Sequence, residues 1–596
     1  MVRCTAYSTT VWRLDKRYEE IVSACRVQGI THIGILASVT GKLYGTPERL
    51  TYYRDKLAQD GISVWAEVFG IGHPAMGNYY LPDGTPPDPA LFWEGDLTLI
   101  QDGAHTGLLP TGWQYAVNEF GNPVYSTACP NKACTDGNLW VMHELTPIFD
   151  EIWYDDEFRL DGDQGAGRPH TSTAACYCDA CLAELSEQLG RTVTREQVLA
   201  DEKLHAAWSD AKTTKMAKLW EAICAQGRAI KPHLRMGLMI RWSGEERDGI
   251  DMAKLLPSFG ERPLLRAGEG HFTVAEYTKP EGQAIEYLET VYHVSWFPQD
   301  VDVWSETTYF SGVRREDILK KVALALGAGV RVIAYCPCVT GWVTEQNFLR
   351  DDRFTIDRWA EVFGDAGRQY EPIVILRGAA AGRGDSEPVK RVRDRQINPL
   401  FSMAGLFATS ARIGAWRDDG SQPIVAVTGR TVWDTSLADL AGRQIVLDGA
   451  ALLEDAPFLR ELGISAAHKG AEGLVAFEGQ GYQADGQLWT KGSVTVIPYV
   501  WQDVPKEAWP ALLSEIRRVL ASKTRACVVE GDPFVLPVHY RRDLYDAILL
   551  VNLTHEERRI HLRAPADRPE LLDGDGRPVC ADMTLAADEV KLLIAR

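Results

Sequence analysis

The sequence predicts an α/β fold: a (β/α)8 TIM barrel over residues 1–372, a smaller open α/β domain over 373–535, and a small C-terminal β domain over 536–596. Strand and helix patterns alternate eight times in the first segment, as they do in a TIM barrel. The chain of 596 residues is also too long for a single domain. The last segment has short strand patterns separated by polar turns, and no helix pattern.

The barrel strands are expected where short apolar segments end in turn residues or charges. They are residues 4–9, 31–38, 63–72, 151–158, 234–242, 263–272, 300–310 and 330–338. Amphipathic helix patterns lie between or after them, at residues 14–29, 47–61, 139–150, 315–329 and 352–367. The polar segment 73–138 is rich in glycine and proline and is much longer than an ordinary connection, which indicates a functional role.

The rest of the chain has a different pattern. Between 373 and 535 we expect strands at residues 372–379, 423–429 and 443–449, and helices at residues 398–414 and 505–522. These units predict an open α/β domain of the flavodoxin or glutamine-amidotransferase type, with a possible role in oligomerisation. The final strands, at 546–554, 558–564, 568–574 and 589–596, predict a β-sandwich-like domain.

Composition narrows the range of partners. A formal charge of -19 and a pI of about 5.2 repel nucleic acid and anionic lipid, so neither is expected as a partner. The 18 Trp and 21 Tyr suit sites that are apolar on one face and wet on the other, such as carbohydrate sites. The sequence shows neither an export signal nor an apolar run long enough to cross a bilayer, so we expect a cytoplasmic protein.

Acidic residues lie at the ends of two predicted barrel strands. Asp155, Asp156 and Glu157 end the fourth strand, and Glu306 ends the seventh. In a TIM barrel these strand ends form the mouth, where the chemistry takes place. Two carboxylates are the minimum for cleaving a glycosidic bond, one as a general acid and one as a nucleophile or base. Glu157 is the predicted proton donor and Glu306 the predicted partner.

Other residues near the strand ends are candidates for substrate binding. Glu269 on the sixth strand is an alternative nucleophile, and Glu67 on the third could bind a sugar hydroxyl. Asp156 points away from the direction of its neighbour Glu157 if the strand alternation holds. The full set of predicted substrate-binding residues is Asp156, Trp304, Tyr309, Glu67, Glu269 and Trp342.

Three cysteines follow the fourth strand closely. Cys176, Cys178 and Cys181 offer three thiolates within six residues, a spacing and ligand type that favour tetrahedral zinc. Cys129 and Cys134, in the long polar segment, are the candidates for a fourth ligand. Four thiolates leave no open position for water, so such a zinc would be structural. No organic cofactor is expected.

The region around the fourth strand resembles glycoside hydrolase family 42, the β-galactosidase family. The resemblance rests on Trp153 to Phe158, on His170, and on the run from Cys176 to Cys181. Cys129 followed by proline is similar to the first zinc ligand of that family, which favours Cys129 over Cys134. The resemblance implies a retaining mechanism with Glu157 as acid/base and Glu306 as nucleophile. It also implies a homotrimer assembled through the α/β domain.

One position departs from the family pattern. Asp156 stands where the family has an asparagine that hydrogen-bonds the sugar 2-hydroxyl, and a carboxylate cannot donate that bond as an amide does. A β-galactoside is the default substrate. The alternatives are a glycoside of different specificity, such as a uronic acid, an arabinoside or a mannoside, and a non-catalytic carbohydrate-binding relative. Retention of both Glu157 and Glu306 favours an enzyme.

Overall fold

The structure is a computed structural model of the chain. It describes residues 3–72, 112–155, 158–160, 162–163, 172–173, 175–240, 249–260, 262–267, 277–295, 302–308, 313–336, 348–363, 368–378, 397–413 and 424–596.

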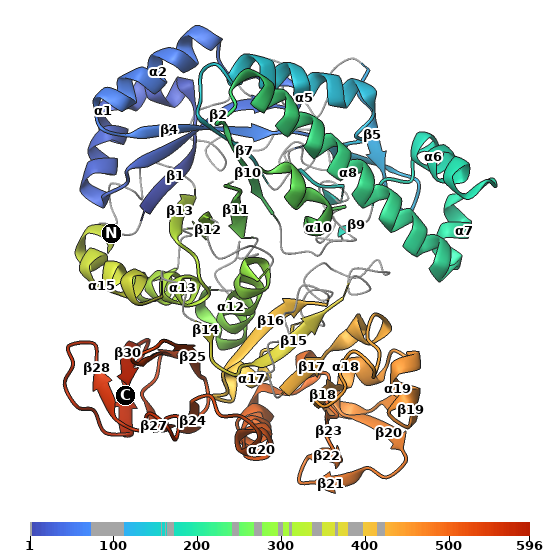
Figure 1. Cartoon of the computed structure of the whole chain (residues 1–596), viewed down its shortest axis with the longest axis vertical. Coiled ribbons are helices and arrows are strands. Elements are labelled where there is room, and N and C mark those ends of the chain that lie inside the picture. Colours follow the sequence, from blue (N-terminus) through green and yellow to red (C-terminus); the bar gives the residue numbers. More distant parts are fainter. Residues whose placement is uncertain are drawn as a thin grey trace.

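Eight parallel strands form a closed barrel in the first part of the chain (Figure 1). They are β1 (Arg3–Thr9), β2 (His32–Val39), β4 (Ser63–Phe69), β7 (Glu151–Tyr154), β10 (Arg235–Met239), β11 (Leu264–Ala267), β12 (Asp302–Thr308) and β13 (Val332–Cys336). The barrel closes because β1 pairs with both β13 and β2. The short strand β3 (Lys42–Leu43) adds to β2 in the antiparallel direction. The predicted TIM barrel and its eight strands are confirmed.

Helices surround the barrel on the outside. They include α1 (Val11–Gln28), α2 (Pro47–Gln59), α5 (Lys132–Leu145), α8 (Glu202–Ile230), α10 (Met252–Leu255), α12 (Pro280–Val294), α13 (Arg315–Gly327) and α15 (Phe348–Phe363). Their ends follow local sequence signals. The Thr10 hydroxyl accepts a hydrogen bond from the Arg13 amide at the start of α1, and Gly29 ends that helix in the left-handed conformation. No helix of the described residues has the length and apolar character needed to cross a membrane.

Three tryptophans fill the barrel interior. Trp65, Trp153 and Trp304 are almost completely buried and pack together, with the Trp153 and Trp304 ring centroids 3.9 Å apart. Two glycines make room for them. A Cβ atom at Gly34 would lie 2.4 Å from the Trp65 ring, and one at Gly237 would lie 2.2 Å from Trp153. The interior of the barrel is therefore a packed core, in which glycines on neighbouring strands leave space for the tryptophan rings.

The middle domain is built on a seven-stranded sheet in the order β16-β15-β17-β18-β23-β22-β21. Its strands are β15 (Ile373–Arg377), β16 (Ala408–Arg412), β17 (Ile424–Val427), β18 (Gln444–Asp448), β21 (Gln483–Asp485), β22 (Leu488–Lys491) and β23 (Val494–Ile497). The first five strands of that order are parallel, and β22 and β21 extend the sheet as an antiparallel hairpin. The hairpin of β19 (Ile464–Lys469) and β20 (Val475–Gly479) was not predicted.

One predicted helix of this domain is wrong over most of its length. Residues 398–414 contain only the single turn α17 (Leu400–Met403), after which the chain forms the edge strand β16. Gly405, at φ 80°, ends the helical turn, and β16 then pairs in parallel with β15. The apolar residues of 406–411 match a buried strand as well as a buried helix, and tertiary pairing decided between them.

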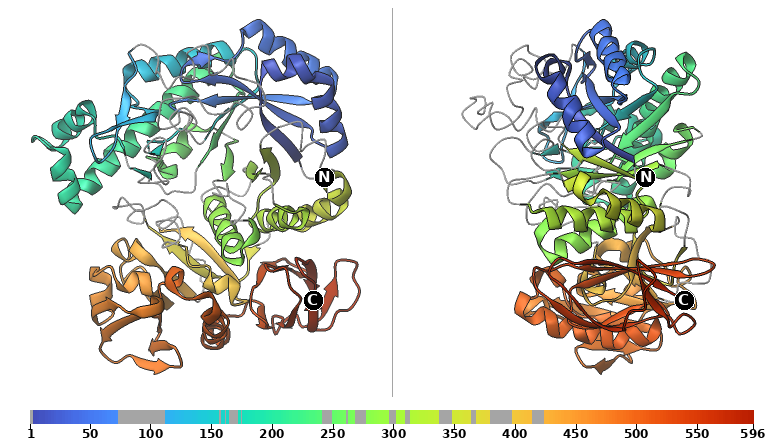
Figure 2. Two further views of the ribbon diagram at one scale, coloured as in Figure 1. Left: turned by 180° about the vertical axis from the view of Figure 1, so that it is seen from behind. Right: turned by 90° about the vertical axis from the view of Figure 1, so that its left-hand side faces the viewer.

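The C-terminal domain consists of two antiparallel sheets, in the orders β14-β25-β26-β30-β28 and β24-β27-β29. Their strands are β14 (Arg368–Gln369), β24 (Val528–Gly531), β25 (Val535–Arg541), β26 (Asp546–Asn552), β27 (Arg558–Arg563), β28 (Leu571–Asp573), β29 (Asp582–Leu585) and β30 (Val590–Ala595). Strand pairing thus places β14 and β24, which precede residue 536, with the C-terminal sheets. The middle and C-terminal domains lie side by side on one flank of the barrel (Figure 2).

Candidate functional site

Charged side chains lie on the inward face of four barrel strands, beyond the tryptophan core. Glu67, Arg266 and Glu306 each follow an inward core residue by two positions: Trp65 on β4, Leu264 on β11 and Trp304 on β12. Because side chains alternate along a strand, these three also face inward, nearer the carboxyl end of the strand. Asp155 stands in the same relation to Trp153 of β7, and its amide still donates to the Val68 carbonyl.

Arg266 connects two of these acids. Its Nη1 forms an ion pair with Oε2 of Glu306, and its Nη2 lies 3.4 Å from Oδ1 of Asp155. The three residues are all buried, with exposed fractions of 2%, 5% and 7% for Arg266, Glu306 and Asp155. Charges that are this deeply buried are costly unless they are paired, and the guanidinium supplies the pairing.

The structure describes two of the predicted acids of the barrel, Glu306 and Glu67. Glu306 occupies the inward face of β12 near its carboxyl end, as the sequence pattern indicated. Glu67 is completely buried on β4. The remaining predicted acids and aromatic residues of the mouth lie outside the described residues: Asp156, Glu157, Glu269, Tyr309 and Trp342.

The predicted role of Trp304 needs correction. We expected its ring to contact substrate, but it is fully buried in the barrel core between Trp65 and Trp153. The reason is its position on the strand. Trp304 is two residues before Glu306 on the same face of β12, so it lies deeper in the barrel than the carboxylate does. It supports the site from below and does not line it.

Sequence reasoning missed Arg266 and did not single out Asp155. A signal for Arg266 was present: it is the only charged residue of the four-residue strand β11, at an inward position two residues after the core residue Leu264. An arginine that faces the interior of a barrel needs an acidic partner. The pattern could therefore have indicated that Arg266 pairs with the acids of neighbouring strands.

The four cysteines form a compact cluster beside the barrel. The sulfur atoms of Cys129, Cys176, Cys178 and Cys181 all lie within 4.8 Å of one another. Cys129 Sγ is 3.6 Å from Cys181 Sγ and 3.7 Å from Cys178 Sγ. Zinc–sulfur bonds of about 2.3 Å in a tetrahedron place the sulfurs about 3.8 Å apart. The donor set and its spacing therefore fit a tetrahedral zinc ion.

The fold places Cys129, which the family resemblance favoured, beside the other three cysteines, and leaves Cys134 outside the cluster. Cys129 follows the strand β6 (Pro123–Ala128) and enters the cluster, whereas Cys134 lies within α5. The sulfur of Cys134 instead accepts a hydrogen bond of 3.7 Å from the Asn138 side chain. Burial raises the pKa of Cys134 to about 12, so its thiol stays protonated at neutral pH.

Neighbouring groups hold the cysteine cluster in place. Cys178 is the N-cap residue of α6 (Asp179–Leu189), and the Trp208 indole donates to the Cys176 carbonyl. The Val117 amide donates to Cys176 Sγ at 3.4 Å. Lys215 Nζ lies 3.5 Å from Cys181 Sγ and forms an ion pair of 2.9 Å with Glu184. A pocket of about 360 Å³ borders Cys176 and Cys181.

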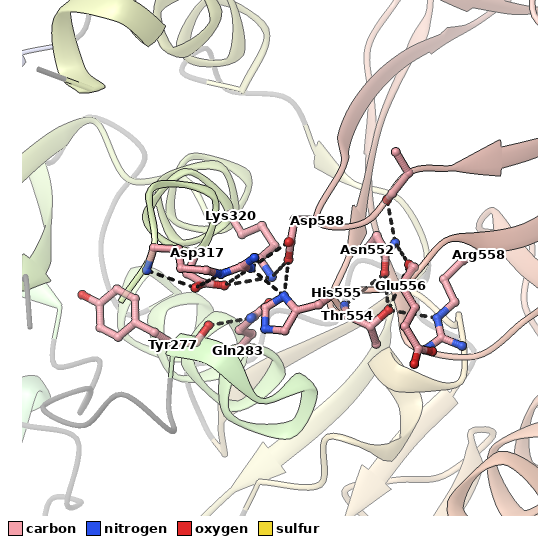
Figure 3. A network of polar contacts seen from close by, with 12 residues as sticks. Tyr277, Gln283, Asp317, Lys320, Asn552, Thr554, His555, Glu556, Arg558 and Asp588 are labelled. Atoms are coloured by element: carbon pink, nitrogen blue, oxygen red, sulfur yellow. Dashed lines mark hydrogen bonds and ion pairs between the residues drawn. The ribbon is translucent and has the colours of Figure 1, made fainter. Parts of the chain in front are cut away.

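Asp317, His555 and Asp588 form a second group of possible metal ligands, but the ammonium group of Lys320 already lies between the two acids. Figure 3 shows Lys320 between the two acids, with its Nζ 2.6 Å from Asp588 and 3.3 Å from Asp317. His555 Nδ1 lies 2.8 Å from Asp588. Because Asp317 and Lys320 belong to α13 and the other two residues to the C-terminal domain, the network joins that domain to the barrel.

These features together define a class of architecture. A closed parallel barrel of eight strands, followed by an open α/β domain and a β domain, is the fold of solved glycoside hydrolase family 42 β-galactosidase structures. The likeness extends over the whole chain. The sequence itself matches no protein-family model and no curated protein.

Three solved structures illustrate the similarity. A GH42 β-galactosidase from G. stearothermophilus superimposes with a TM-score of 0.63 at 11% identity, over 100% of this chain and 98% of that chain. A β-galactosidase from Bacillus circulans sp. alkalophilus gives 0.60 at 11% identity, over 100% and 99%. One from the psychrophilic Marinomonas gives 0.61 at 9% identity, over 100% of both chains. The architecture predicted from the resemblance is confirmed.

Proposed function

We propose that this protein is a retaining glycoside hydrolase, with a β-galactoside as its default substrate. The observation that carries the proposal is the inward-facing, ion-paired Glu306 near the carboxyl end of β12, in a chain that shares the fold of family 42 β-galactosidases along its whole length. The carboxyl ends of the strands form the active-site face in characterised TIM-barrel enzymes.

The reaction proceeds in two displacements. In the first, a carboxylate oxygen of Glu306 bonds to the anomeric carbon as the bond to the leaving oxygen breaks, and Glu157 gives its proton to that oxygen. In the second, a water molecule attacks the anomeric carbon, its proton passes to Glu157, and Glu306 is released as a carboxylate. The two inversions together retain the configuration of the sugar.

The substrate is tested with a panel of nitrophenyl glycosides that includes galactosides, arabinosides, mannosides and glucuronides. Hydrolysis of the β-galactoside with release of the β-anomer is the expected result. Preferential cleavage of another glycoside would show a different sugar specificity, and the protein would still be a glycoside hydrolase. Binding of sugars without turnover of any member of the panel would instead indicate a carbohydrate-binding relative.

A structural zinc ion belongs to the same proposal. Cys129, Cys176, Cys178 and Cys181 would hold it, and its four thiolates would tie the segment after β6 to the start of α6. Four thiolates would leave the metal no open position for water or substrate. The metal would therefore hold the loops in place and take no part in the reaction. We also propose a homotrimer, from the family resemblance, and a cytoplasmic location. Light scattering on the purified protein tests the trimer, and cell fractionation tests the location.

A further inference from the structure

Two arginines connect the strands β7 and β12 at opposite ends of the barrel. At the amino ends, Arg235 of β10 contacts Glu151 of β7 at 2.9 Å and Asp302 of β12 at 2.6 Å. At the carboxyl ends, Arg266 of β11 pairs with Asp155 after β7 and with Glu306 of β12. We call the Arg266 group at the carboxyl ends the upper arrangement and the Arg235 group at the amino ends the lower arrangement. Each upper acid lies four residues after a lower acid: Asp155 after Glu151, and Glu306 after Asp302.

The two ion pairs differ in burial. The Arg235 side chain is 29% exposed, whereas the Arg266 side chain is 3% exposed. Water still solvates the lower arrangement, so it stabilises the barrel at modest cost. The upper arrangement removes three charged groups from water, which costs several kcal/mol per ion before pairing offsets it. Well-packed apolar residues in place of such a buried ion group are often as stable, so stability is weak grounds for the group of Arg266, Asp155 and Glu306.

We propose that Arg266 is a positioning residue for Glu306. The inference rests on the proposed function. A neighbouring guanidinium favours the ionised form of a carboxylate, which is the form that attacks the anomeric carbon. Its planar, rigid set of donors also restricts the rotation of the carboxylate it binds. Arg266 therefore keeps Glu306 charged and aimed.

The second acid, Asp155, completes the arrangement. When the glycosyl–enzyme ester forms, Glu306 loses its negative charge and Arg266 would be left as a buried, unbalanced cation. Asp155 remains as its counter-ion, so the covalent intermediate contains no uncompensated arginine. Near the carboxyl ends of the described strands, the inward-facing Glu67 is a further buried acid, while Lys321 approaches β12 from outside and contacts Ser305.

The test compares Arg266→Gln and Arg266→Lys with Arg235→Gln in the full-length protein. Arg266→Gln should lower kcat/KM by about 100-fold, the loss that accompanies a misplaced reacting group. It should also move the acidic limb of the pH profile to higher pH, because the carboxylate loses the charge that favours ionisation. Arg266→Lys keeps the charge and loses the fork, so it should leave the acidic limb in place and lower kcat several-fold.

Arg235→Gln is the matched control, since it breaks the same strand-to-strand connection outside the site. It should lower the Tm and leave kcat and the pH profile unchanged. Wild-type kcat/KM and pH profile in Arg266→Gln would overturn the inference and leave the proposed function standing. If Arg266→Gln does not fold, a wild-type kcat in Arg266→Lys overturns it. A wild-type protein that turns over no glycoside would overturn both.

Discussion

Cys129 and Cys181, 52 residues apart in the chain, place their sulfur atoms 3.6 Å apart. Such an approach joins the segment after β6 to the first turn of α6 and lies close to the edge length of a zinc–thiolate tetrahedron. The polar segment before β7 and the loop after it are thereby connected at one point. The cysteine cluster therefore fixes the segment after β6 against the start of α6.

Metal analysis of the purified protein should find about one zinc per chain, since one tetrahedral site takes four thiolates. Cys129→Ser should lower the zinc content and the Tm together, because metal binding is coupled to folding. Cys134→Ser is the control, because Cys134 is a buried cysteine outside the cluster. Equal zinc loss in both variants, or a wild-type protein without zinc, would contradict the site.

Glu306→Gln should abolish turnover of an activated aryl glycoside while leaving the fold intact. The amide has the size of the carboxylate but lacks the charge required of the nucleophile. Activity is measured alongside Tm and circular dichroism. The same measurements on Glu67→Gln show the effect of replacing another buried acid of the inward face. An active Glu306→Gln enzyme would refute the nucleophile assignment and direct attention to Glu269.

Glu157→Gln should slow natural substrates much more than aryl glycosides with good leaving groups. A leaving group that departs as a stable anion needs little protonation, so loss of the general acid matters less for it. A Brønsted plot of kcat/KM against leaving-group acidity, for the wild type and the variant, measures the effect. Equal loss across the series would show that Glu157 is not the proton donor.

Stability should fall as the pH drops below about 6.5, because of His539 in the C-terminal domain. Burial lowers the pKa of His539, although the neighbouring Asp546 carboxylate opposes the shift. Its Nδ1 accepts from the Cys527 amide and its Nε2 lies 3.0 Å from Asp546, so the native ring is neutral. Below pH 6.5 the unfolded chain binds a proton that the native ring does not, which favours unfolding.

Urea unfolding at about pH 7.5 and pH 5.5 tests this dependence. His539→Gln should flatten it, and the exposed His561, replaced by glutamine, is the control. Asp546 does not contribute to the change in stability between about pH 7.5 and pH 5.5. Its pKa is lowered from 3.8, since its bonds to His539 and Arg541 outweigh the effect of burial, so its contribution is lost only in stronger acid. An unchanged slope in His539→Gln would contradict the assignment.

Gly237→Ala should destabilise the barrel by about 1–3 kcal/mol, the usual cost of overpacking a core. The added methyl would lie 2.2 Å from the Trp153 ring, which is fully buried and packs against Trp65 and Trp304. Gly574→Ala is a suitable control, because its methyl would meet its nearest neighbour at 3.4 Å. Denaturant unfolding followed by tryptophan fluorescence measures the difference.

The barrel could be predicted because its signals are local. Each strand is a short apolar segment with its own turn residues, and eight such segments in order leave few other topologies. The segment 398–414 failed because an apolar run of that length suits a strand or a helix equally, and pairing with β15 made it a strand. The hairpin of β19 and β20 has one exposed face and carried too weak an apolar signal.

At the site, the sequence alone determined the residue types and their positions on strands: Glu306 near the end of β12, and three cysteines spaced for one metal. Local pattern determines such features because strand alternation and ligand spacing act over a few residues. Only the tertiary structure decided that Trp304 belongs to the core and that Arg266 lies between Asp155 and Glu306. Those relationships join residues from separate strands and loops, and they depend on the stagger of the closed barrel, which no short stretch of sequence encodes.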